Sequence, residues 1–292
     1  MITVIIPTYN RAGLLPKALQ SVSQQSLACD ELIVVDDGST DATAELVHEF
    51  AETSSITVRY LYQGNSGASA ARNLGIREAS SDMLCFLDSD DWWDSNKLAY
   101  QYAAMEAAPE YLISHTRETW FRHGKRVNQK KKHAPPHGDI FARSLGMCVV
   151  GMSTVMVHRS LFDQYGCFDE SLLCCEDYDL WLRVSRKEHF LLVDEPLTLK
   201  DGGRTDQLSA IHRLGMDTWR IRALCKLLKH NVLTERQYDL AHTELERKCR
   251  IYGNGCIKHG RTEQGQKYLD LPAQYNRVEQ TADMSNQPVS KP

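Results

Sequence analysis

The N-terminal third of the chain alternates short apolar runs with segments in which apolar residues recur at helical spacing. The runs lie at 2–6, 31–35, 60–62 and 83–87, and their composition is that of buried strands. A helical face follows the first run, with Asn10 as its expected N-cap and apolar residues at Leu14, Leu15, Ala18, Leu19 and Val22. Strands about 30 residues apart with a helix between them form βαβ units. The pattern therefore predicts a parallel sheet flanked by helices.

The pattern beyond residue 95 is less regular. Residues 111–127 predict a β-hairpin turning at His123-Gly124-Lys125, and a basic loop follows at 130–138. Further strands are expected at 153–157, 190–193 and 196–199. Trp181 belongs to a predicted helix before residue 190 and is expected to lie in the core. Residues 214–269 are helical in pattern, with a cap near 233–236, and the polar segment 278–292 is expected to be disordered.

Composition narrows the class of protein. The chain has 292 residues, 42% of them hydrophobic, and its net charge of -4 argues against a nucleic-acid partner. Nine cysteines form no C-x-x-C pair, which suits a reducing cytosol. The first strand-like run begins at Ile2, so a signal peptide is not expected, and no apolar run is long enough for a membrane span. We expect a cytoplasmic protein, with a location at the inner face of the membrane left open.

Carboxylates and hydroxyls follow the predicted strands at the points where these end. Asp88-Ser89-Asp90-Asp91 follows one strand, Asp36 follows another, and Thr8 follows the first. In open α/β sheets, ligands bind beyond the carboxyl ends of the strands. Carboxylate oxygens suit Mg²⁺ or Mn²⁺, which keep coordination positions free for phosphate. The alternative is that 88–91 only caps a helix starting near Asp94.

Other sequence features bear on the ligand. A G-x-G-x-x-G turn after the first strand and a P-loop are both absent from the sequence, which weighs against a dinucleotide-dependent dehydrogenase. Gly64 and Gly67 permit close approach of the backbone to a ligand, and Arg72 on the next helix could face a base or phosphate. A nucleotide diphosphate with a divalent metal is the simplest common ligand.

Five segments occur in the order typical of one enzyme family. They are residues 4–10, 34–41, 65–73, 86–91 and 176–181. Together they resemble the family 2 glycosyltransferases across residues 2–200. The resemblance implies the α/β GT-A fold, with a mostly parallel central sheet flanked by helices, and the helical pattern beyond it predicts a C-terminal helical appendage. The expected domains are therefore a catalytic domain at 1–210 (nucleotide-binding half 1–95, acceptor half 96–210), a helical extension at 211–277 and the tail.

The resemblance implies nucleotide-binding roles for four residues. Asp36 would contact the base, with Thr8 and Arg72 helping to hold the nucleotide, and Asp88 would lie near the ribose. Three of these residues also have a structural alternative: Thr8 could satisfy the strand-end backbone, Asp36 could be a turn residue, and Arg72 could be a surface ion-pair partner. Asp37 and Asp91 are expected to be structural, as turn and cap residues.

The resemblance also implies a metal ligand and a base. Asp90 would bind Mn²⁺ or Mg²⁺, and Asp177 would be the general base, although a carboxylate in the first turn of a helix is also favoured by the helix dipole alone. Relatives often carry a histidine in the loop that here spans 201–209, where the matching position holds Arg204. A guanidinium cannot ligate a metal but pairs with phosphates, so Arg204 is the predicted diphosphate-binding residue.

These inferences predict a metal-dependent inverting glycosyltransferase. It would move a sugar from a nucleotide-diphosphate donor to a hydroxyl of a glycan or lipid-linked acceptor, in surface polysaccharide assembly. A sugar nucleotidyltransferase and a catalytically silent nucleotide-sugar-binding protein are the alternatives. The helical extension could pack on the core, form a homodimer, or contact an anionic membrane through Arg220, Arg222, Lys226 and Lys229.

Overall fold

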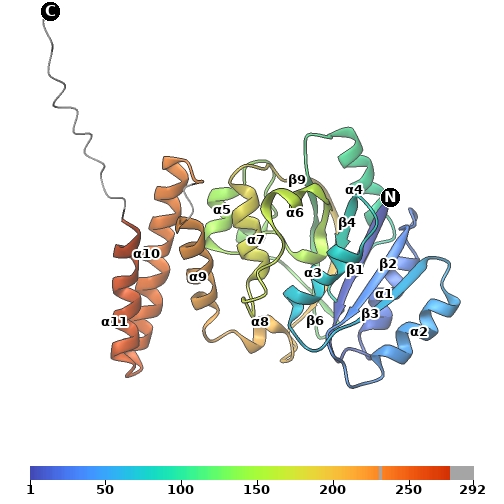
Figure 1. The fold of residues 1–292 in the computed structure, drawn as a ribbon, viewed down its shortest axis with the longest axis horizontal. Coiled ribbons are helices and arrows are strands. Elements are labelled where there is room, and N and C mark those ends of the chain that lie inside the picture. The colour runs from blue at the N-terminus through green and yellow to red at the C-terminus, as the bar shows by residue number, and fades with distance from the viewer. Residues whose placement is uncertain (230–231, 277–292) are drawn as a thin grey trace, which may run out of the picture.

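The N-terminal half is built from three parallel strand pairings. The computed structural model describes residues 1–229 and 232–276, so the tail expected at 278–292 lies outside the described residues. The strands β1 (Ile2–Thr8), β2 (Glu31–Asp36), β3 (Thr57–Tyr62) and β4 (Met83–Phe86) pair in parallel in the order β3-β2-β1-β4. The helices α1 (Leu15–Ser23), α2 (Thr43–Thr53) and α3 (Ala68–Glu78) connect them (Figure 1). This half of the sheet is the one that the apolar runs predict.

The sheet continues beyond β4 with mixed pairing. Its order is β4-β8-β6-β9-β5, and β7 pairs with the C-terminal end of β6. Here β6 and β9 pair in parallel, whereas β8 is antiparallel to both β4 and β6, β7 is antiparallel to β6, and β5 is antiparallel to β9. The strands are β5 (Asp91–Trp93), β6 (Ile113–Arg122), β7 (Lys125–Val127), β8 (Val155–His158) and β9 (Leu191–Gly202). The hairpin turning at His123 is confirmed, whereas the two strands expected at 190–193 and 196–199 are one strand.

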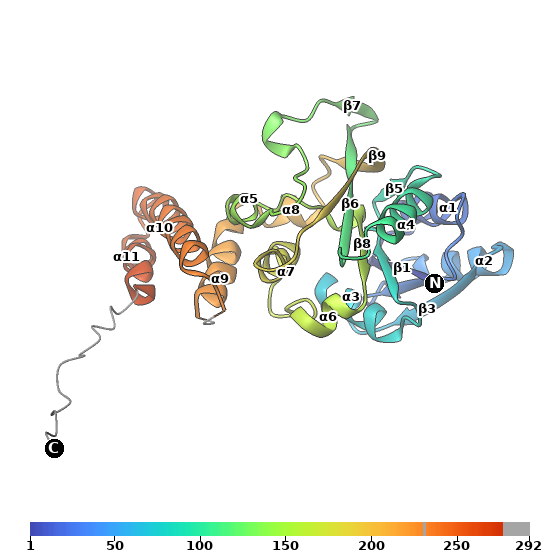
Figure 2. The same cartoon turned by 90° about the horizontal axis from the view of Figure 1, so that it is seen from above.

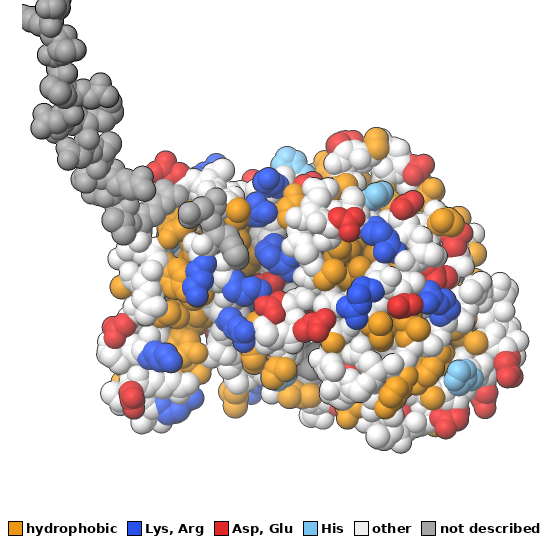
Figure 3. Space-filling view, in the orientation of Figure 1, with side chains coloured by type: hydrophobic (Ala, Val, Ile, Leu, Met, Phe, Trp, Pro, Cys, Tyr) orange, Lys and Arg blue, Asp and Glu red, His pale blue; other side chains and the backbone are white. Residues whose placement is uncertain are grey.

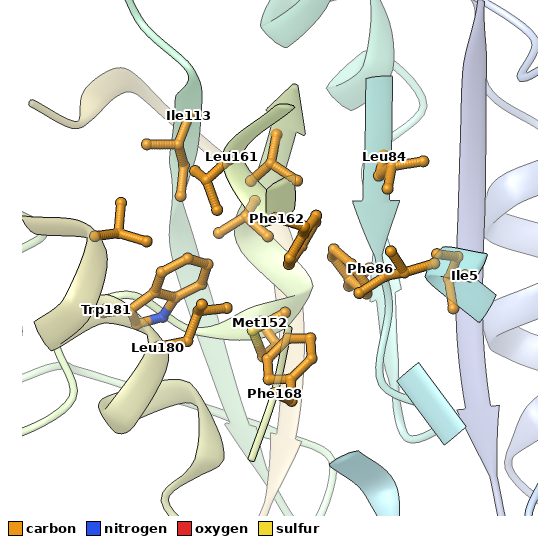
Figure 4. Close-up of a cluster of buried hydrophobic side chains, with 14 of the residues drawn as sticks. Ile5, Leu84, Phe86, Ile113, Met152, Leu161, Phe162, Phe168, Leu180 and Trp181 are labelled. Carbon is orange, nitrogen blue, oxygen red and sulfur yellow. The ribbon is translucent and has the colours of Figure 1, made fainter. Parts of the chain in front are cut away.

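Helices cover both faces of the sheet. Along β1, Val4 and Ile6 pack with α1 and with α4 (Lys97–Ala107), whereas Ile5 packs on the opposite face with α3 (Figure 2). On the face of Ile5, Phe86 meets Phe162 and Phe168 with ring centroids 5.9 Å apart in each pair (Figure 4). The helices between β7 and the C-terminal helices are α5 (Phe141–Gly146), α6 (Ser160–Tyr165), α7 (Glu176–Ser185) and α8 (Leu208–Ile211). Trp181 of α7 is 1% exposed, in keeping with its expected place in the core.

Two expected helix caps are wrong. Asn10 does not cap α1, because that helix begins at Leu15; instead the Asn10 carboxamide accepts the Thr40 N–H at 2.8 Å, and its backbone has a φ of 50°. Asp91 does not cap α4, because that helix begins at Lys97 and Asp91 lies in β5, paired with β9. Both residues are held by partners distant in sequence, which outweigh the local capping preference.

The C-terminal helices share a core with the sheet-bearing part of the chain. They are α9 (Met216–Lys229), α10 (Glu235–Lys258) and α11 (Thr262–Asp270). Phe141 of α5 and Tyr178 of α7 belong to the same buried cluster as Leu224 of α9 and Leu245 of α10. A capping box at Thr234 starts α10, at the position where the sequence indicated a cap. These helices therefore pack on the rest of the fold.

The cations proposed for membrane contact are largely engaged within the protein. Lys226 pairs with Asp179 at 2.8 Å and also with Asp169, and Arg222 donates to the Ser171 hydroxyl at 2.8 Å. Figure 3 shows Lys and Arg side chains gathered where the C-terminal helices meet the sheet-bearing part. In the described ranges, the chain has no helix with the length and apolar character needed to cross a membrane.

We expect Gly253→Ala to destabilise the protein. A Cβ at Gly253 would lie 2.8 Å from the Gly265 carbonyl oxygen, where α10 crosses α11, so the helices would have to move apart at a cost of about 1–3 kcal/mol. Gly255 of the same helix has nothing within 4 Å of such a Cβ, so Gly255→Ala should stabilise by up to about 1 kcal/mol. Thermal unfolding of both variants measures the difference, and equal melting temperatures would contradict the close crossing.

Candidate active site

The segment after β4 turns sharply and is held by a serine from another element. The Asp91 N–H donates to the Asp88 carbonyl at 2.9 Å, which closes the turn before β5. The Ser153 hydroxyl accepts the Asp88 N–H at 3.1 Å and donates to the Asp91 carboxylate at 2.6 Å. Asp91 is 2% exposed, whereas the Asp88 side chain is 28% exposed. The turn therefore buries one carboxylate and leaves another open to a ligand.

Arg72 joins this segment to the start of α7. Its guanidinium donates to Asp88 Oδ1 at 2.8 Å and to Glu176 Oε1 at 2.6 Å, with the side chain only 5% exposed. Burial alone would raise the pKa of Asp88, but the charge of Arg72 outweighs burial and lowers it. Burial alone would likewise lower the pKa of Arg72, but the charges of Asp88 and Glu176 raise it. Arg72 is thus a buried bridge and not the surface ion-pair partner of the structural alternative.

Asp177 lies directly after this bridge, in the first turn of α7. One carboxylate oxygen accepts the Tyr178 N–H at 2.6 Å, and the other accepts the thiol of Cys148 at 3.2 Å. Burial, followed by the neighbouring charge of Glu176, raises the pKa of Asp177 to about 6. A carboxylate with such a pKa is a stronger proton acceptor near neutral pH than an ordinary aspartate.

The residues expected to bind the base lie at the ends of β1 and β2. Asp36 is 1% exposed, and its carboxylate accepts the Ser39 N–H and the Tyr60 hydroxyl, each at 2.7 Å. The Thr8 hydroxyl is buried and has no hydrogen-bond partner among the described residues. A buried polar group usually has a partner, so a ligand at this edge would satisfy Thr8.

Asp37 is structural, but not in the way expected. Its carboxylate accepts the Ser66 and Gly67 N–H groups at 2.8 Å and the Gln63 carboxamide at 2.7 Å. It therefore holds the glycine loop before α3 in place and does not cap α2.

Asp90 faces the loop that follows β9. Its Oδ2 accepts from the Arg204 guanidinium and from the Gln207 carboxamide, the latter at 3.0 Å. Arg204 also pairs with Asp206 at 3.2 Å, and Asp206 pairs in turn with Arg11. The side chains of Asp90 and Arg204 are 17% and 22% exposed. This loop therefore closes over the metal-ligand candidate and brings the predicted diphosphate-binding residue to it.

Lys200 is a functional candidate that sequence reasoning missed. Its ammonium lies 3.6 Å from Asp91 and 3.7 Å from Glu118. Burial alone would lower the pKa of Lys200, but Asp91, Glu118 and Asp88 raise it well above its usual range, so the ammonium stays charged. The sequence signal was a lysine directly after an apolar strand, but the expected strand stopped at Leu199.

The carboxylates of this site fit a divalent metal that binds together with a phosphate-bearing ligand. Among residues 1–229 and 232–276, no group of three or more His, Cys, Asp and Glu side chains is arranged to hold an ion. Mg²⁺ is commonly held by one or two carboxylates with phosphate oxygens and water completing the shell. Asp90 can supply such an oxygen once its pair with Arg204 opens, because both groups are partly exposed.

Comparison with known proteins identifies the family of the chain. Residues 3–166, more than half of the chain, match the family described as Glycosyl transferase family 2. An uncharacterised glycosyltransferase of Rickettsia felis is 34% identical over 203 residues, covering 68% of this chain and 32% of that protein. The chain thus matches about a third of the length of that relative. The UDP-Glc:alpha-D-GlcNAc-diphosphoundecaprenol beta-1,3-glucosyltransferase WfgD of Escherichia coli is 28% identical over 66% of this chain and 73% of its own.

Solved structures share the fold. TarS residues 1–349 of S. aureus, in complex with UDP-GlcNAc, superpose with a TM-score of 0.72 and 16% identity, covering 93% of this chain and 79% of that one. The mannosyltransferase PcManGT of Pyrobaculum calidifontis, in complex with GDP-Man and Mn²⁺, gives a TM-score of 0.57 and 18% identity, covering 93% and 85%. The chain therefore belongs to glycosyl transferase family 2 and has the GT-A fold.

Proposed function

We propose that the chain is a metal-dependent inverting glycosyltransferase that moves a sugar from a nucleotide-diphosphate donor to a hydroxyl of a glycan or lipid-linked acceptor. The observation that carries the proposal is the Arg72 bridge. By binding Asp88 at the end of β4 and Glu176 at the start of α7, Arg72 brings the neighbouring Asp177 to the segment that contains Asp90. This bridge would bring a carboxylate suited to proton removal to the part of the site that contains the metal-ligand candidate.

The nucleotide end of the donor would lie at the edge formed by β1 and β2. Asp36 would accept from the base, and the unpartnered Thr8 hydroxyl would gain a partner there. Asp88, with its partly exposed side chain, would face the ribose. Arg72 would act mainly by fixing Asp88, since both of its terminal nitrogens are already bonded. The UDP-GlcNAc and GDP-Man named with the two solved structures support a donor of this class.

Asp90 would hold Mn²⁺ or Mg²⁺, which when bound neutralises charge that develops on the departing diphosphate. Arg204, released from Asp90, would pair with the diphosphate oxygens, because a guanidinium binds phosphate in bidentate geometry. Lys200 would add a second fixed positive charge at the same edge of the sheet. These groups of the chain favour departure of the nucleotide diphosphate.

Asp177 would remove the proton of the acceptor hydroxyl as that oxygen attacks the anomeric carbon. The bond to the acceptor forms while the bond to the diphosphate breaks, so one displacement without a protein nucleophile inverts the anomeric centre. The printed name of WfgD includes a diphosphoundecaprenol acceptor, which supports a lipid-linked acceptor and a place in surface polysaccharide assembly. On this proposal the enzyme works at the cytoplasmic face of the membrane.

We expect Asp177→Asn to abolish transfer while donor binding persists. Loss of a general base lowers the rate by about 10²–10⁴-fold, whereas the carboxamide keeps the size of the side chain. Transfer from UDP- and GDP-sugars to diphosphoundecaprenol-linked GlcNAc measures the first effect, and calorimetry with UDP and GDP measures the second. Asp163→Asn, on the exposed surface of α6, is the matched control. Full transfer by Asp177→Asn would contradict the assignment, and would favour a different base.

We expect the rate to fall on the acid side of pH 6. Asp177 has a raised pKa of about 6 and is a base only when it has lost its proton, so kcat/KM should rise with pH through that value and level off above it. The measurement is the pH profile of kcat/KM between pH 5 and 8. A profile that stays flat across this range would be inconsistent with Asp177 as the base.

We expect Mn²⁺ to strengthen nucleotide binding through Asp90. Calorimetry with UDP and with GDP, each in Mn²⁺ and in EDTA, should show tighter binding with the metal for the natural chain. Asp90→Asn should lose most of this gain, because an amide oxygen is a weaker ligand than a carboxylate. Asp94→Asn, just beyond β5, is the control for the loss of one carboxylate nearby. If neither nucleotide binds under either condition, the proposed function is wrong.

A further inference from the structure

We propose that Cys148 is a positioning residue for the base, and that its thiol holds Asp177 by donating a hydrogen bond to the carboxylate. The inference rests on the proposed function, since it deepens the role of Asp177. It adds a residue that lies outside the five segments on which the family resemblance was based. Because α10 holds the segment just before Cys148, the C-terminal helices also contribute to the site.

The thiol has two acceptors within reach, and one of them is favoured. Cys148 Sγ lies 3.2 Å from Asp177 Oδ2 and 3.2 Å from the Val150 carbonyl oxygen. That carbonyl already accepts the indole N–H of Trp181 at 3.0 Å. A thiol has a single proton, and a hydrogen bond to an ionised acceptor is stronger than one to a neutral carbonyl. The proton is therefore directed at Asp177.

The bond fixes the carboxylate at both of its oxygens. Oδ1 of Asp177 accepts the N–H of Tyr178 at 2.6 Å from its own helix, and Oδ2 accepts the thiol from a different segment of the chain. The neighbouring Glu176 is tied to Arg72, which holds the beginning of α7. Rotation of Asp177 would break one of these bonds, so its remaining lone pairs keep a constant direction toward the acceptor.

The segment that carries the thiol is itself fixed on two sides. The Tyr178 hydroxyl donates to the Leu145 carbonyl at 2.6 Å, which ties α5 to α7. Lys248 of α10, 2% exposed, donates to the Gly146 carbonyl at 3.0 Å. The C-terminal helices thus hold the end of α5, two residues before Cys148. A thiol on an unsupported loop could not orient a neighbouring carboxylate.

The thiol acts as a donor because it remains protonated. Burial, together with the charge of Asp177, raises the pKa of Cys148 well above its usual range. The hydrogen bond with the Val150 backbone and the positive charge of Lys200 in β9 oppose this shift. The charged or titratable groups facing Asp177 are Glu176 of α7, Arg72 of α3, Cys148, and Cys174 and Cys175 of the preceding loop. A donated hydrogen bond favours the ionised form of Asp177, so its loss makes the base harder to ionise.

Cys148→Ala tests the proposal through the pH profile of transfer. We expect the acid limb of the profile, the rise of kcat/KM with pH around 6, to move to higher pH by about one unit, since a hydrogen bond to a charged group is lost. Activity at pH 8 should fall much less than activity at pH 6. Cys148→Ser retains a donor and should keep the limb close to that of the natural chain. Cys167→Ala, which removes an exposed thiol, is the matched control.

The infrared S–H stretching band provides a second measurement that needs no substrate. The Cys148 band is identified as the band lost in Cys148→Ala, and we expect it to shift in Asp177→Asn and as the pH passes through about 6. The Cys167 band should stay constant. A Cys148 band that changes in neither condition overturns the proposal, and so does an acid limb that does not move in Cys148→Ala.

The two hypotheses fail in different ways. If Asp177→Asn retains transfer, the base assignment is wrong and the proposed positioning role fails with it. If Asp177→Asn abolishes transfer but Cys148→Ala keeps the natural acid limb and Cys148→Ser behaves like it, only the role of Cys148 is overturned.

Discussion

The buried guanidinium of Arg72 is the interaction on which the candidate site depends. The Arg72 side chain is 5% exposed and binds carboxylates from two elements more than 80 residues apart, Asp88 and Glu176. Removing one partner of a buried ion pair typically costs about 3–5 kcal/mol, because the other charge stays buried and unpaired. The fold therefore holds the strand end and the helix start at a fixed separation. Asp177, one residue after Glu176, takes its place in the site from this constraint.

The three aspartates after β4 each meet a cation from a different part of the chain. Asp88 meets Arg72 of α3, Asp91 meets Lys200 of β9, and Asp90 meets Arg204 of the loop beyond β9. Carboxylates this close would repel one another without such partners. The pairs differ in exposure, since Arg72 is buried and Arg204 is partly exposed. Under the proposed function, Asp90 is thus the carboxylate most easily released to a metal diphosphate, whereas Asp88 is fixed.

The sequence could predict the elements whose formation depends on neighbouring residues in the chain. The apolar runs gave β1, β2, β3 and β4 within a few residues, and the polar residues at their ends gave the edge at which Thr8, Asp36 and Asp88 lie. Asn10 and Asp91 were misread because tertiary partners decide their conformation. Asn10 is bonded to Thr40, and Asp91 belongs to a short strand whose partner, β9, lies about a hundred residues further on.

Contacts across the chain set the limit of sequence reasoning at the site. Strand alternation could indicate which face Lys200 occupies, but not that it meets Asp91, because the register of β5 on β9 is not encoded in either strand alone. The thiol beside Asp177 likewise depends on the packing of α5 against α7.

The C-terminal helices support the part of the fold that contains α5 and α7. Their buried residues share one cluster with α5 and α7, and Lys248 reaches from α10 to the carbonyl of Gly146. Lys226 of α9 binds Asp179 at 2.8 Å, two residues after the proposed base. A helix whose first turn contains a base must not rotate, because a small displacement of a catalytic group is costly to the rate. Packing α9 and α10 against α7 and α5 restrains that rotation from the side opposite Arg72, so the two constraints together hold Asp177.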